Sequence, residues 1–189
     1  MICVSAGKMT LEISENINNI DAINYEQDMY VKFRNTKLVS KNDLALMRDL
    51  STFILEKFFH KKTIRQMDIV VTLRDDYLEK YNMYGDCLAE DLSPRPRWFS
   101  INLDGIQKRC IMLNTLAHEL VHVKQWAKGE MYEYTKRPGH VRFGKEIVNT
   151  KNTDYWDHPW EIEAHGRAIG LVAQWKKSRD LKDDDLMIS

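Results

Sequence analysis

The spacing of apolar residues along the chain predicts three helices. Residues 43–59 carry an apolar side chain at every fourth position from Leu46 to Phe58, which is typical of one face of a helix. Similar patterns predict helices over residues 108–128 and 159–177, where a glycine follows the first and a proline begins the second. Each predicted helix has an apolar face, so we expect each to pack against other elements.

Shorter apolar patterns between these helices predict strands. Residues 68–73 form a β-branched run that is typical of a buried strand, and residues 97–104 alternate between apolar and polar side chains. Residues 85–90 are a candidate third strand. Residues 130–155 are polar and interrupted by glycine and proline, and we interpret them as a long irregular connection. The order of elements predicts an α+β fold in which a small mixed sheet packs on helices.

Length and composition favour one globular domain with loose ends. The 189 residues are 43% hydrophobic, which is sufficient for a sizeable core. We assign residues 1–40 to a weakly defined lead-in, residues 41–178 to the domain and residues 179–189 to a charged tail. The three cysteines are odd in number and form no CxxC pair, which argues against a disulfide framework.

The charge of the chain limits the classes of partner. Lys plus Arg and Asp plus Glu each number 28, so the formal net charge is zero and bulk attraction to nucleic acid or an acidic membrane is not expected to drive function. We find no apolar run long enough to span a membrane and no secretion signal at the start. We therefore expect an intracellular protein without a membrane partner.

The strongest chemical signal is the HExxH motif in the second predicted helix. His118 and His122 are four residues apart, so a helix places both imidazoles on one face, where they can bind one metal ion. Glu119 lies between them and can act on water activated by that ion. The leucines of this helix fall on the opposite face, which argues against a pair of core histidines. A pair of solvent-exposed histidines without a metal is the alternative.

A catalytic zinc commonly has three protein ligands and one open position, so a third ligand is expected downstream. Glu161 falls on the inward, apolar face of the last predicted helix, where a carboxylate needs a partner. Glu163 falls on the polar side of that helix beside Arg167, where it can remain solvated. These positions favour Glu161 as the third ligand and leave Glu163 and His140 as alternatives.

These residues carry a resemblance to known enzymes. The segment HELVH in an otherwise apolar helix, followed by PWEIEA on a second helix, resembles the zincin metallopeptidases, in particular the gluzincins, whose third ligand is a glutamate. More closely, LNTLAHELVHVKQ together with Tyr155 and PWEIEAHGR resembles small metallopeptidases encoded by tailed phages, which are often labelled SprT-like. The resemblance covers residues 85–175. It implies a zincin-like fold and, for a phage protein, the host cytoplasm.

The resemblance also implies roles for individual residues. His118, His122 and Glu161 match the zinc ligands, and Glu119 matches the general base of peptide hydrolysis. His165 follows Glu161 by four residues and is a candidate for orienting a ligand. The zincin fold implies a sheet whose edge strand borders the cleft, and residues 97–104 fit that position by their order in the chain.

Hydrolysis through a metal also needs a donor for the developing oxyanion. Tyr155 and His158 lie just before the third-ligand helix and are the candidates, with Tyr155 preferred as a catalytic residue. The expected function is therefore a zinc-dependent metallopeptidase that acts on a protein or peptide.

Two other functions remain as alternatives. One is a zinc-containing regulatory or binding protein without activity, although Glu119 would serve no purpose there. The other is a DNA-associated protease of the SprT-like kind. SprT-like proteins use a histidine in a His-Gly pair as third ligand, whereas this chain has the reverse order at Gly139 and His140. Basic residues of the long connection, Lys136, Arg137, Arg142 and Lys145, could steer an acidic substrate or nucleic acid, which is not the favoured partner.

Overall fold

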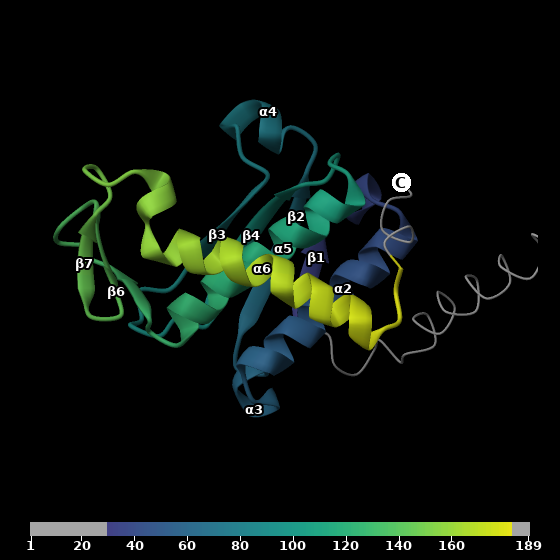
Figure 1. Cartoon of the computed structure of the whole chain (residues 1–189), viewed down its shortest axis with the longest axis horizontal. Helices are drawn as coiled ribbons and strands as arrows, with labels where there is room; N and C mark the ends of the chain where they lie inside the picture. Colours follow the sequence, from purple (N-terminus) through teal and green to yellow (C-terminus); the bar gives the residue numbers. More distant parts are fainter. Residues whose placement is uncertain (1–29, 183–189) are drawn as a thin grey trace, which may run out of the picture.

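A four-stranded sheet and three long helices form the body of the protein in the computed structural model, which describes residues 30–182 (Figure 1). The strands follow the order β1 (Val31–Arg34), β2 (Asp68–Arg74), β4 (Trp98–Asp104) and β3 (Gly85–Ala89) across the sheet. The first three are parallel, and β3 runs antiparallel to β4. The sheet is therefore mixed, and the predicted α+β class is confirmed.

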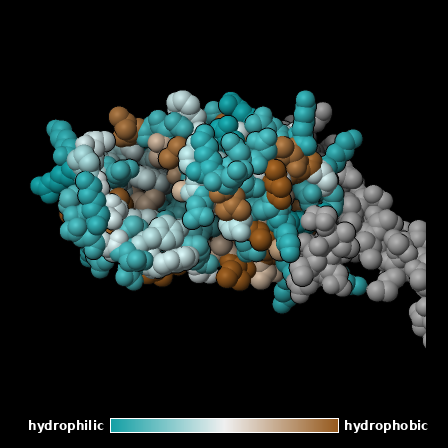
Figure 2. Space-filling model, turned by 90° about the horizontal axis from the view of Figure 1, so that it is seen from above, coloured by the Kyte–Doolittle hydropathy of each residue, from teal (hydrophilic) through white to brown (hydrophobic). Residues whose placement is uncertain are grey.

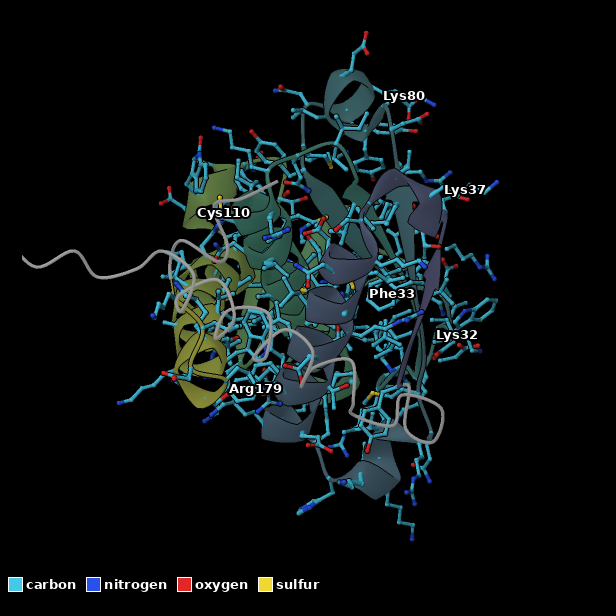
Figure 3. The ribbon with its side chains drawn as sticks, turned by 90° about the vertical axis from the view of Figure 1, so that its right-hand side faces the viewer. Lys32, Phe33, Lys37, Lys80, Cys110 and Arg179 are labelled. Atoms are coloured by element: carbon cyan, nitrogen blue, oxygen red, sulfur yellow. The ribbon has the colours of Figure 1, made fainter. Side chains whose placement is uncertain are left out.

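The helices α2 (Lys41–Phe58), α5 (Arg109–Ala127) and α6 (Pro159–Ser178) agree closely with the three predicted helices. In Figure 3 the sheet, the α2 and α5 layer, and α6 follow one another from right to left. Phe33 points from β1 toward α2, whereas Lys32 points to the other side of the sheet. The described chain also contains short helical segments, namely η1 (Thr36–Leu38), α3 (Lys61–Ile64), α4 (Tyr77–Tyr81) and η2 (Tyr155–Asp157).

One apolar core holds these layers together. Side chains with no exposed surface include Leu50 and Ile54 from α2, Ile101 from β4 and Leu120 from α5. Trp175 of α6 is also fully buried and joins the same cluster. Burial of this apolar surface is the dominant favourable contribution to folding, and it fixes how α5 and α6 lie against each other.

The prediction of an irregular connection at residues 130–155 is wrong. The strands β5 (Met131–Glu133), β6 (His140–Phe143) and β7 (Glu146–Asn149) form a separate antiparallel sheet in this segment. Gly144 has a φ of 58° and begins the two-residue turn between β6 and β7, a position that favours glycine in tight hairpins. Val141 of this sheet packs against Met131 and Trp160 in a second small cluster.

The expectation that residues 97–104 form the edge strand is also wrong. The strand β4 pairs with β2 on one side and with β3 on the other, so it lies inside the sheet. The antiparallel β3 is the edge strand next to α5. A Cβ at Gly85 would come within 2.8 Å of the Leu103 and Thr115 side chains, and Thr115 belongs to α5, so α5 packs closely on one face of β3.

The described residues also bear on the ends of the domain. The strand β1 lies within the segment assigned to the lead-in, and it belongs to the main sheet. Predictions about residues 1–29 and 183–189 lie outside the described residues. Between residues 30 and 182, no helix has the length and apolar character that a membrane crossing would require.

Candidate metal centre

Three side chains from α5 and α6 converge at one point between the two helices. His118 and His122 are one turn apart on α5, and their Nε2 atoms are 3.0 Å from each other. Glu161, in the first turn of α6, places Oε2 3.2 Å from Nε2 of His118 and 3.5 Å from Nε2 of His122. The structure thus brings together the two histidines and the favoured third residue.

This cluster is nearly buried. The side chains of His118, His122 and Glu161 are 12%, 9% and 11% exposed. Although burial raises the pKa of Glu161, hydrogen bonds with His118 and His122 outweigh it and hold the pKa well below its usual range. Burial lowers the pKa of His118, whereas for His122 contact with Glu161 and the charge of Glu119 outweigh burial and raise the pKa. Glu161 is therefore an ionised carboxylate that faces two imidazoles.

Gln125 fixes the orientation of one imidazole. Its Nε2 donates to the Trp160 carbonyl oxygen at 2.9 Å and to Oε2 of Glu163 at 3.1 Å. Its Oε1 is left as an acceptor and lies 2.8 Å from Nδ1 of His122. Because Nδ1 must donate this hydrogen bond, Nε2 of neutral His122 carries a lone pair directed at His118 and Glu161. Such a partner on the far nitrogen is characteristic of metal-binding histidines.

The donor set fits a zinc ion. Two imidazole nitrogens and one carboxylate oxygen form the His₂Glu set of many catalytic zinc sites. The two Nε2 atoms are 3.0 Å apart, so either a proton carried by one of them or a metal ion bound by both must lie between their lone pairs. His118, His122 and Glu161 are the residues that would hold it.

Glu119 lies beside this cluster without a fixed partner. One of its carboxyl oxygens lies within 4.8 Å of a ring nitrogen of His118 and of His122, and the residue is only 4% exposed. Within residues 30–182, no hydrogen bond or ion pair involves its carboxyl group. Burial raises the pKa of Glu119 to about 8, against the opposing influence of His122. A carboxyl group of this kind can exchange a proton near neutral pH.

Tyr155 in η2 reaches the same point from the other side. Its hydroxyl donates to Oε2 of Glu161 at 2.7 Å, although the residue as a whole is 47% exposed. Burial of the phenol raises its pKa, and the hydrogen bond to Glu161 raises it further. Tyr155 therefore keeps its proton and remains a hydrogen-bond donor at neutral pH. The second candidate donor, His158, instead stacks its ring on Trp160 with centroids 4.5 Å apart.

The alternative third ligands lie elsewhere. Glu163 accepts hydrogen bonds from Lys124 at 2.7 Å and from Arg167 at 2.6 Å, in addition to that from Gln125. His140 lies in β6 of the small sheet, and no group of potential ligands within the described chain includes it. Glu163 therefore supports the site through Gln125 and is not directed at the histidines.

Sequence reasoning missed the supporting role of Gln125 and Lys124. The helical pattern places Gln125 on the histidine side of α5, which was the available signal, but its partners come from α6. Lys124 is only 6% exposed and pairs with Glu130 at 2.5 Å as well as with Glu163. Its burial depends on one carboxylate just beyond the end of α5 and on another from α6, and spacing alone does not reveal the second.

One of the basic residues of the small sheet, Arg142, is engaged in contacts within the protein. Arg142 donates to the Gly144 and Gly129 carbonyl oxygens and lies over the ring of Tyr132.

The space-filling view in Figure 2 shows a hollow in the surface between the middle of the molecule and the end that β6 and β7 form.

Comparison with known proteins adds no relative to this picture. No protein-family model, curated protein or solved structure matches the chain. The geometry of the cluster is therefore the main indication of function.

Proposed function

We propose that this chain is a zinc metallopeptidase with a zincin-like, gluzincin type of active site. The observation that carries the proposal is the convergence of Nε2 of His118, Nε2 of His122 and Oε2 of Glu161 within 3.5 Å. The HExxH spacing and the unpaired Glu119 support it, because a purely structural site has no need for a base beside its ligands.

The residues around the cluster suit peptide hydrolysis. Zinc held there would supply a Lewis acid that polarises a carbonyl group and makes water a nucleophile near neutral pH. Glu119 would take the proton of the attacking water and return it to the leaving amine, which its raised pKa and missing partners allow.

Tyr155 would stabilise the oxyanion that forms as water attacks. Its hydroxyl already points at Oε2 of Glu161, so a small movement could redirect it to a substrate oxygen close to the ligands. Because Tyr155 stays protonated, it can donate this hydrogen bond throughout the reaction.

The free edge of β3 is the proposed binding surface for the substrate backbone. The strand pairs only with β4 among the described elements and lies against α5, which carries the two histidines. An extended peptide could add to this edge through main-chain hydrogen bonds. Leu88, which is 51% exposed, would then contact substrate side chains.

The test is metal-dependent cleavage of an unfolded protein by the purified chain. We expect a strong chelator to abolish cleavage and about one equivalent of zinc to restore it. Tyr155→Phe should retain zinc but lower kcat by about 10²–10³ while leaving KM nearly unchanged, as for loss of one oxyanion donor. Cleavage that survives complete removal of metal would contradict the proposal.

A further inference from the structure

His165 is a second imidazole of α6 that approaches the candidate metal centre. It lies one helical turn after Glu161, and its ring centroid is 4.3 Å from that of His118. Trp156 also packs on it, with centroids 5.1 Å apart and ring planes 35° from parallel. Within the described part of the chain, no hydrogen bond or ion pair involves the His165 imidazole. Ring contacts alone therefore position it, and it does not orient His118 through a hydrogen bond.

The donor atoms of His165 lie within reach of the same ligands. One donor atom each from His118, Glu161 and His165 lie within 4.8 Å of one another. His118 and Glu161 also form the tighter triangle with His122. Two triads thus share an imidazole and a carboxylate, and together they contain four ligands of the types that zinc accepts.

We propose that His165 is a fourth, exchangeable protein ligand of the zinc ion, which closes the metal centre until substrate displaces it. This inference rests on the proposed function, because it requires zinc at His118, His122 and Glu161. Four protein ligands are typical of closed zinc sites, and three with an open position are typical of catalytic ones. Movement of one imidazole would convert this site from the first kind to the second.

The surroundings of His165 allow this movement. The residue is exposed, whereas His118 and His122 are nearly buried between α5 and α6. Within the described chain no hydrogen bond holds its imidazole, and a Cβ added at Gly166, the next residue of α6, would meet no atom within 4 Å. A rotation of the His165 side chain therefore breaks only contacts with neighbouring rings.

The test is the number of imidazoles bound to zinc, measured by X-ray absorption spectroscopy on the zinc-loaded full chain without substrate. We expect three imidazoles per zinc in the wild type and two in His165→Ala, that is, the loss of one. His140→Ala is the matched control, since His140 lies in the small sheet, and it should keep three. Circular dichroism of each variant would verify that the fold is retained.

The outcomes separate this inference from the proposed function. Zinc bound through two imidazoles in both the wild type and His165→Ala would overturn the role of His165 and leave the metallopeptidase proposal intact. A wild type that binds no zinc would contradict both.

Discussion

A buried carboxylate lies at each end of α6, Glu161 at its start and Asp49 of α2 near its last turn. The two carboxylates have different partners. Near the end of the helix, Asp49 of α2 accepts from the Trp175 indole at 2.6 Å. It also accepts from Nε and Nη2 of Arg179, a residue labelled in Figure 3, at 2.8 and 2.9 Å. At the start of the helix, Glu161 faces the two imidazoles of α5 and the hydroxyl of Tyr155.

The two clusters differ in how fully contacts within the protein satisfy the carboxylate. Asp49 has fixed N–H donors and a permanent positive charge from Arg179, so this cluster is complete within the protein. In the Glu161 cluster two imidazole nitrogens face each other, and within residues 30–182 no lysine or arginine forms a hydrogen bond or ion pair with Glu161. A buried carboxylate is costly without a counter-charge, and a zinc ion would supply it. Burial alone would not have separated the two, because Asp49 is 6% and Glu161 8% exposed.

The largest effect is expected from a change in the chemistry of the Glu161 end. Glu119→Gln removes the proposed base but none of the ligands, so the rate of peptide hydrolysis should fall by about 10²–10⁴. Zinc content should stay at the wild-type value. Glu163→Gln, a carboxylate change of the same kind on α6, is the control and should keep most activity. A wild-type rate of peptide hydrolysis in Glu119→Gln would contradict a catalytic role for the Glu161 end of the helix.

For the free energy of unfolding, the larger loss is expected at the Asp49 end of α6. Asp49→Ala leaves the indole and guanidinium groups without their acceptor, so the free energy of unfolding should fall by about 3–5 kcal/mol. In metal-stripped protein, Glu161→Ala should lower the free energy of unfolding by at most about 1 kcal/mol. The variant loses the hydrogen bonds of Glu161, but it also removes the cost of burying a carboxylate that has no lysine or arginine partner. Urea unfolding of both variants measures this difference. Equal losses would show that the Glu161 cluster is as structural as that of Asp49.

A smaller effect is expected from the support of His122. Gln125→Leu removes the acceptor of the Nδ1 proton, so the Kd for zinc should rise by about 10–100-fold. Competition with a chelator of known affinity measures this change. Gln107→Leu, an amide near the start of α5 that donates to the Asp104 carbonyl oxygen, should leave the Kd unchanged. An unchanged Kd in Gln125→Leu would show that His122 needs no orientation from Gln125.

The smallest effect is expected at the solvent-exposed side of the same network. Arg167 is 52% exposed and pairs with Glu163 one helical turn away. Such pairs contribute about 0.3–0.5 kcal/mol, so Arg167→Ala should change the free energy of unfolding by about that much. The zinc Kd should not change, because Lys124 and Gln125 still hold Glu163. A tenfold change in the zinc Kd would show that the exposed Arg167 contributes to zinc binding.

Patterns within single elements made much of this site predictable. Apolar spacing gave the three long helices, and helical geometry placed His118 beside His122 and Glu161 on the inward side of α6. The conflict between a carboxylate and an apolar face was the informative signal. It is a local property, which sequence carries well.

The features that were missed depend on contacts between distant segments. The small sheet has strands of three or four residues, too short for a clear alternating pattern, and Gly144 was its main signal. The position of β4 inside the sheet depends on β3, which returns antiparallel to its edge. Likewise, Gln125 acquires its role only when α6 packs on α5. Strand order and helix packing are tertiary properties, so spacing along one element does not specify them.

The most direct test of the central claim is zinc content per chain, measured by elemental analysis of protein purified without a metal-binding tag. We expect about one zinc per wild-type chain and a clear loss in Glu161→Ala, with Glu163→Gln, which keeps a side-chain oxygen acceptor, as the neighbouring control that retains the metal. The absence of zinc from the wild type after reconstitution, or equal zinc in Glu161→Ala, would contradict a metal centre formed by two histidines and Glu161.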